Sequence, residues 1–263
     1  MPLILKIKHR KSYPLLIYGV GETKTLLKGG LGIVGSRNIN SQDTIYSERA
    51  GIRCAEEGVM VISGGARGID TLSMMACLNE GGTGLIILPA ELSKNALNSS
   101  YNKFIINSRL TLISTEIPES GWTPGRAMAR NKFIYSMSKK ALIVACYERK
   151  GGTWNGATEC LKNNWTDVYV KKNPEKDSAI YSLVERGARL DSELVISDCK
   201  NLDYDLEKML VSEISILQKK SIPSVKSFLT KSKINCLDYP EPIRKSRENK
   251  KEDLSSKQQV LDL

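Results

Sequence analysis

The sequence is poor in the residues that build metal sites and catalytic triads. It holds one histidine, His9, and none of its cysteines forms a Cys-x-x-Cys pair. The cysteines are Cys54, Cys77, Cys146, Cys160, Cys199 and Cys236. Zinc sites need Cys and His at short spacings, so we expect no metal and mostly buried, reduced thiols. A triad would have to use His9 in a basic leader, so most triad chemistry is excluded.

Long apolar runs are also missing. No stretch approaches the roughly 18 apolar residues of a membrane-spanning helix. The apolar patch at the N-terminus is broken by basic side chains between Lys6 and Lys11, which argues against a signal peptide. We therefore expect a soluble, cytoplasmic protein with no membrane partner.

Two fingerprints of nucleotide cofactors are absent. A dinucleotide-binding Gly-x-Gly-x-x-Gly should follow the first strand, yet "GIVGSRNINSQ" lacks its second and third glycines. No Gly-x-x-x-x-Gly-Lys-[Ser/Thr] of a P-loop occurs either. Nicotinamide cofactors and P-loop nucleotide hydrolysis are therefore disfavoured, and we expect no cofactor.

Positive charge is what the sequence has in excess. Its 39 Lys and Arg residues outnumber 29 Asp and Glu, for a net charge of +10. The basic residues are dense in the first thirty positions and again between Arg126 and Lys150. Such an excess attracts polyphosphates through counterion release, although a merely soluble basic surface is the simpler explanation.

Apolar runs alternate with amphipathic segments along the first 200 residues, which is typical of an α/β fold. The predicted strands are 31–36, 59–63, 84–88, 110–114, 141–146, 167–170 and 193–197. The predicted helices are 41–57, 69–80, 95–107, 129–138, 154–164 and 178–187. We expect an extended Rossmann-like, doubly wound, mostly parallel sheet with helices on both faces.

The character of the sequence changes after residue 200. Apolar residues recur at helical spacing over 204–220 and again over 224–234. From Glu241 onward the chain is polar and charged. We expect a Rossmann-like domain over 1–200, a short helical extension packed on it over 201–240, and a flexible charged tail over 241–263.

Three glycine-bearing turns follow predicted strands, at 35–38, 63–70 and 149–159. The carboxyl ends of parallel strands line one crevice, so these turns should meet. Glycine allows backbone N–H groups to approach a phosphate, and the following helix offers its positive end. A single such turn needs glycine for steric reasons alone, but the three together predict a phosphate-binding crevice.

Basic side chains accompany these turns. Arg37 and Arg67 provide bidentate donors for phosphate, although either could instead pair with a carboxylate such as Asp70 or Glu116. Arg130 and its neighbours are expected at the start of a short helix, pointing at the crevice mouth, with a solvated helix face as the alternative. The candidate phosphate-binding residues are Gly35, Ser36, Arg37, Ser63, Gly64, Gly65, Arg67, Gly68, Arg130, Asn131, Lys132, Gly151, Gly152 and Thr153.

These motifs together resemble the DNA-processing protein A (DprA, or Smf) family. "GIVGSRN" and "VISGGARGID" are similar to that family's Gly-Ser-Arg and Ser-Gly-[Gly/Ala]-Ala-x-Gly-Ile-Asp turns. "YPLLIYGVGETKTLL", "ISTEIPESG" and "ARNKFIYSMSKKALIVA" resemble flanking stretches in the same order. Met74 stands where the family has histidine, and we expect the family's core domain without its helical and winged-helix modules.

The resemblance implies a non-enzymatic protein that binds single-stranded DNA in the crevice. It also implies a homodimer that protects single strands and assists recombinase loading during DNA uptake or recombination. Base stacking would come from scarce aromatics such as Trp122 and Trp154, for which a core or lid role is the alternative.

Two other functions stay open. One is a neutralising or nucleotide-sensing partner of a toxin or phage-defence protein, with a nucleotide in the crevice. The other is a nucleotide phosphoribohydrolase, because "GGTWNGATE" faintly resembles the turn of such enzymes, with Glu159 and Arg130 in acid and anchoring roles.

Overall fold

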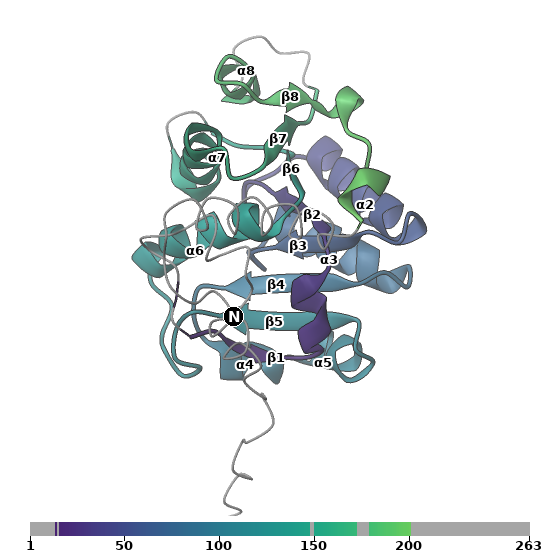
Figure 1. Ribbon diagram of the computed structural model, residues 1–263, viewed down its shortest axis with the longest axis vertical. Helices are drawn as coiled ribbons and strands as arrows, with labels where there is room; N and C mark the ends of the chain where they lie inside the picture. Colours follow the sequence, from purple (N-terminus) through teal and green to yellow (C-terminus); the bar gives the residue numbers. More distant parts are fainter. Residues whose placement is uncertain (1–13, 15, 148–149, 173–178, 201–263) are drawn as a thin grey trace, which may run out of the picture. The chain divides into compact units, whose positions relative to one another are not determined.

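Strands of the computed structural model form one mostly parallel sheet (Figure 1). The structure describes residues 14, 16–147, 150–172 and 179–200. Within them the strands are β1 Tyr18–Val20, β2 Gly30–Val34, β3 Met60–Ser63, β4 Gly84–Leu88, β5 Leu110–Ser114, β6 Lys140–Ile143, β7 Asp167–Val170 and β8 Arg189–Leu190. Their order is β1-β5-β4-β3-β2-β6-β7-β8, and only β1 runs antiparallel to its neighbour, β5. The predicted Rossmann-like, doubly wound α/β fold is confirmed.

Helices cover both faces of the sheet, as expected for crossover connections between parallel strands (Figure 1). They are α2 Ser41–Glu56, α3 Ile69–Asn79, α4 Leu92–Ala96, α5 Ser99–Ile106, α6 Pro124–Met137, α7 Gly151–Asn163 and α8 Ala179–Val184, with short 3₁₀ turns at Thr23–Leu27, Asp191–Glu193 and Ser197–Cys199. Along β4, Leu85 and Ile87 belong to the core cluster on the face covered by α6, α7 and α8, whereas Ile86 and Leu88 belong to the cluster on the face covered by α2, α3 and α5. This alternation buries both faces, which explains why the strands read as continuous apolar runs.

The edges of the sheet differ from the prediction. Residues 193–197 are not a strand, because the chain leaves the ladder after two residues of β8 and turns at Asp191. The Asp191 carboxylate accepts hydrogen bonds from the Tyr46 hydroxyl and from the Lys172 N–H, and these bonds hold the turn. At the other edge, β1 was not predicted, since three residues are too few to show a two-residue period.

Helix starts also differ from the prediction. The segment 95–107 is two helices, because the Asn98 side chain accepts from the Ser100 N–H and begins a new one. The helix predicted over 129–138 begins at Pro124, capped by Thr123, and α7 begins at Gly151 rather than at residue 154.

The helical extension expected over 201–240 and the tail over 241–263 lie outside the described residues. The domain boundaries at 200 and 240 therefore stay predictions.

Candidate nucleic-acid interface

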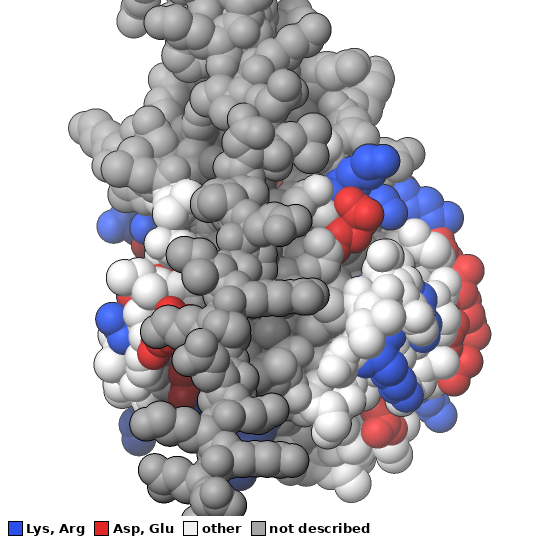
Figure 2. All heavy atoms as spheres, turned by 90° about the horizontal axis from the view of Figure 1, so that it is seen from below, with Lys and Arg blue, Asp and Glu red and all other residues white. Residues whose placement is uncertain are grey.

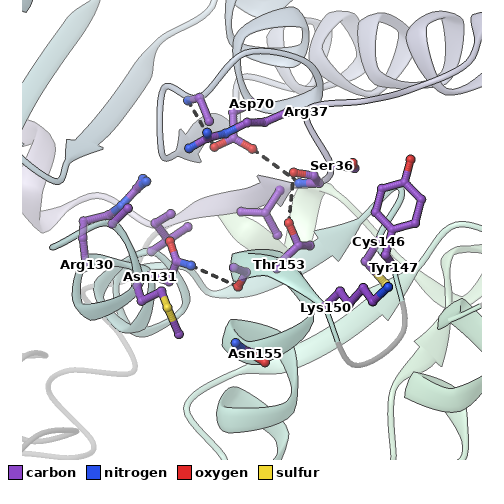
Figure 3. Close-up of a pocket in the computed structure, with 18 of the residues that line it drawn as sticks. Ser36, Arg37, Asp70, Arg130, Asn131, Cys146, Tyr147, Lys150, Thr153 and Asn155 are labelled. Atoms are coloured by element: carbon purple, nitrogen blue, oxygen red, sulfur yellow. Dashed lines mark hydrogen bonds between the residues drawn. The ribbon is translucent and has the colours of Figure 1, made fainter. Parts of the chain in front are cut away.

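The strand order reverses between β2 and β6, which lie side by side although β3, β4 and β5 separate them in sequence. Ligands of open α/β sheets bind at the carboxyl ends of the strands at such a reversal. A cavity of about 480 Å³ lies there, lined by residues from 34–38, 66–70, 122–135 and 146–155 (Figure 3). We refer to it as the turn cavity.

The structure brings part of the predicted residue set together around this cavity. Those that line it are Gly35, Ser36, Arg37, Arg130, Asn131, Gly151, Gly152 and Thr153. Those that do not are Ser63, Gly64, Gly65, Arg67, Gly68 and Lys132. The first and third turns therefore form the walls, while the second turn contributes Ala66 and Asp70 instead of its glycines.

The second turn is organised around the buried carboxylate of Asp70. This carboxylate accepts hydrogen bonds from the N–H groups of Gly35 at 3.4 Å, Gly64 at 3.1 Å and Ala66 at 3.4 Å. Ser63 is buried too, and its hydroxyl donates to the Ile33 carbonyl at 2.6 Å. We expected the Gly64 N–H to bind a phosphate. Instead it donates a hydrogen bond to Asp70, which lies in the first turn of α3.

Arg130 is a buried arginine in the middle of α6, so its predicted place at the start of a helix is wrong. Only 6% of the residue is exposed, and its Nη1 donates to the Ile87 carbonyl at 2.8 Å. A Cβ at Gly64 would lie 1.8 Å from Nη1, so a larger residue at position 64 would force the Arg130 guanidinium to move. Arg130 is also one of the residues that line the turn cavity.

Asp70 and Arg130 influence each other's ionisation. Burial lowers the pKa of Arg130 to about 10, although the negative charge of Asp70 opposes the shift. The nearby charge of Arg37 lowers it further. Burial raises the pKa of Asp70, while Arg130 and the three N–H donors oppose that rise. An anion entering the cavity between Arg37 and Arg130 would relieve their mutual repulsion.

The third turn is the N-terminus of α7. Gly151 adopts φ +82°, which favours glycine, and Lys150 at the N-cap position makes no capping hydrogen bond with its side chain. The Thr153 hydroxyl donates to the Gly35 carbonyl at 3.0 Å, and the Asn131 amide donates to the Gly152 carbonyl at 3.0 Å. These bonds fasten the α7 start to the turn after β2 and to α6. The first residues of α7 line the cavity, so the positive end of the helix dipole lies there (Figure 3).

Several lining residues were not predicted from the sequence. Tyr147 is exposed at the cavity, and its hydroxyl donates to the Asn38 carbonyl at 3.3 Å. Cys146 and Asn155 also line the cavity. The sequence carried a signal for both Cys146 and Tyr147, because Cys146 ends a predicted strand and Tyr147 follows it, at the edge of the sheet where the turns are expected to meet.

Two sequence hypotheses are changed by the structure. Trp154 is a core residue, buried against the sheet, whereas Trp122 lines the cavity and is exposed. Glu159 lines a different hollow together with Lys162 and Arg186. Arg130 lines the turn cavity, so the two residues proposed for a hydrolase line different hollows.

Figure 2 shows charges of both signs on one face of the molecule. On the face seen in Figure 2, Lys and Arg side chains stand next to Asp and Glu side chains. Within the described ranges, no three His, Cys, Asp or Glu side chains are grouped as a metal site would need. The same residues include no helix with the length and apolarity required to span a membrane.

Comparisons with known proteins point to one family. The family described as DNA recombination-mediator protein A matches residues 2–195. A curated relative, DNA processing protein DprA of Streptococcus pneumoniae, is 27% identical over 188 residues, which are 67% of this chain and 63% of the relative. The chain thus spans less than two thirds of that relative's length.

Solved structures share the fold. DNA processing protein A from Helicobacter pylori, whose structure addresses that protein's single-stranded DNA binding mode, superposes with a TM-score of 0.61 at 21% identity and covers 81% of this chain and 94% of its own. DprA from Streptococcus pneumoniae superposes with a TM-score of 0.62 at 22% identity, over 72% of this chain and 67% of its own. At these identities the likeness establishes a common fold.

Proposed function

The chain belongs to the DNA recombination-mediator protein A family, and from this membership we propose that it binds single-stranded DNA in the turn cavity without catalysing a reaction. The observation that carries the proposal is the convergence of an α7 N-terminus, two exposed cations and a buried guanidinium on one cavity at the strand-order reversal. A relative of the same fold, from Helicobacter pylori, is described as binding single-stranded DNA.

The cavity suits a phosphodiester backbone for physical reasons. The N–H groups at the start of α7 and its helix dipole attract a phosphate oxygen. Arg37 and Lys150 are exposed and add positive charges to the lining of the cavity. These contacts read no base edge, so they would give affinity without sequence choice.

Salt dependence tests this proposal. We expect the protein to bind a fluorescent oligo-dT strand, with log affinity falling linearly in log salt by about 0.7 per phosphate contacted. A blunt duplex of the same length should bind more weakly, because its phosphates cannot follow a cavity that holds one strand. Fluorescence anisotropy between low and moderate salt measures both. Absence of binding at low salt, or affinity indifferent to salt, would overturn the proposal.

The wider biological role rests on family membership alone. We propose that the bound strand is protected and passed to a recombinase, and that the protein acts as a homodimer during DNA uptake or recombination.

A free nucleotide is the second candidate for the cavity. Its volume of about 480 Å³ lies within the range of small-molecule sites, which is roughly 300–1,000 Å³. Such an occupant would suit a nucleotide-sensing partner of a toxin or defence protein. Competition with thymidine monophosphate distinguishes the two candidates. If the cavity is a nucleotide site, the monophosphate should displace oligo-dT at a concentration similar to that of the oligonucleotide; if it is a DNA site, it should not.

A further inference from the structure

Trp122 is a solvent-exposed residue that lines the turn cavity. The residue is 44% exposed, while Trp154 and Trp165 are buried at 5% and 7%. The guanidinium carbon of Arg37 lies 5.6 Å from the centroid of its ring, within the range of a cation–π contact. The indole and a phosphate-binding cation therefore lie together at the edge of the same cavity.

Arg126 holds the chain on which Trp122 lies. Its Nε forms an ion pair with Glu116 Oε2 at 2.8 Å, and its Nη1 donates to the Gly121 carbonyl at 2.6 Å. Its backbone N–H donates to the Thr123 hydroxyl oxygen at 3.2 Å. One arginine thus connects the residues before Trp122, the residue after it and the start of α6.

The same segment is tied to α4 on its other side. The N–H of Glu91 donates to the Ser120 carbonyl at 2.9 Å, and the N–H of Ser93 donates to the Pro118 carbonyl at 3.2 Å. Segment 116–123 is therefore fixed at several points, and Trp122 is presented on a fixed backbone. Holding a ring in advance reduces the ordering entropy that a ligand must overcome.

We propose that Trp122 stacks on a nucleobase of the bound strand, and that Arg126 and Glu116 are positioning residues for it. This inference rests on the proposed binding of single-stranded DNA and adds the base to the phosphate contacts. A base is free to stack on an aromatic ring only when its strand is single, so Trp122 would favour single strands over duplex. Stacking of this kind is tolerant of sequence because every base has a flat face.

A double cycle of protein and DNA variants isolates the stacking. Wild type and Trp122→Ala are titrated with oligo-dT and with an abasic strand of the same length, which keeps the phosphates and removes the bases. We expect Trp122→Ala to weaken oligo-dT binding by about tenfold, since base stacking contributes roughly 1–3 kcal/mol per base. Binding of the abasic strand should be the same for both proteins, and Trp122→Phe should restore part of the loss.

Glu116→Gln tests the positioning role, because the two explanations predict opposite changes in the affinity for oligo-dT. Removing a negative charge should strengthen DNA binding if only long-range electrostatics matter. If Glu116 acts through Arg126 on Trp122, the variant should instead weaken oligo-dT binding and leave the abasic strand no weaker. Ile106→Ala, an exposed apolar residue on α5 that does not line the cavity, should change neither.

The outcomes separate this inference from the proposed function. Equal losses for oligo-dT and the abasic strand in Trp122→Ala, or tighter oligo-dT binding by Glu116→Gln, would overturn the stacking or the positioning role while DNA binding stands. Failure of wild type to bind either strand would overturn the proposed function itself.

Discussion

Asp70→Ala is expected to lower the free energy of unfolding by about 3–5 kcal/mol, a large part of the stability of an ordinary domain. The substitution leaves the N–H groups of Gly35, Gly64 and Ala66 without their acceptor. It also leaves the buried Arg130 without its neighbouring negative charge. Each unsatisfied buried group costs about 1–3 kcal/mol, and water entering the new space recovers only part of it. Urea unfolding followed by circular dichroism measures the change.

Asp198→Ala is the matched control for this stability experiment. Its carboxylate pairs with Lys140 at 2.8 Å but is more than half exposed, so its loss should cost less than about 1 kcal/mol. Asp70→Asn keeps one acceptor oxygen and should fall between the two, which keeps the test informative if Asp70→Ala does not fold. Similar unfolding curves for Asp70→Ala and Asp198→Ala would show that Asp70 does not organise the turns.

The double variant Arg37→Ala with Lys150→Ala is expected to weaken binding of oligo-dT by about 30- to 100-fold at moderate salt. Both side chains are exposed and line the turn cavity, so their removal takes away charge from the binding surface and leaves the core untouched. Hydrogen bonds to charged groups contribute about 1.5–3 kcal/mol each, and screening by salt reduces this. The slope of log affinity against log salt should become shallower by about 1.4, the value for two phosphate contacts.

The double variant Lys94→Ala with Lys103→Ala is the matched control, because it also removes two positive charges but at positions outside the turn cavity. These lysines lie on α4 and α5, are exposed and do not line the cavity. We expect a loss of less than about threefold and an unchanged salt slope. Equal losses in the two double variants would mean that net charge, rather than the turn cavity, governs DNA binding.

The arrangement of the sheet could be predicted because its strands are buried on both faces. Their apolar runs of four or five residues, each followed by a helix-length segment, leave few alternatives to a doubly wound fold. The edges could not be predicted, since β1 and β8 have three and two residues and depend on pairing with β5 and β7. Strands of two or three residues are too short to show a pattern of apolar residues in the sequence.

The candidate site was predictable only at the level of its turns. Glycine content and strand order indicate that the turns meet, but they do not reveal which donors are already occupied. The sequence allows Asp70 to pair with Arg37 or Arg67, whereas in the structure its carboxylate organises the second turn beside Arg130.

The ion pair of Glu116 could not be predicted from the sequence either. Its carboxylate pairs with Arg126 rather than with Arg37 or Arg67. Arg126 lies in the first turn of α6, which starts at Pro124, and its side chain contacts Gly121 and Glu116 in the segment before the helix. Such pairings depend on helix starts and on burial, which single-sequence patterns place only within a few residues.

Hydrogen–deuterium exchange with and without oligo-dT tests most directly whether the turn cavity holds the strand. We expect slower exchange in peptides covering 35–38 and 150–155, which carry the turn after β2 and the start of α7. Peptides covering 92–106, on α4 and α5, should exchange at the same rate with and without DNA. Unchanged exchange in both cavity segments under conditions where the oligonucleotide is bound, or protection confined to 92–106, would contradict the account.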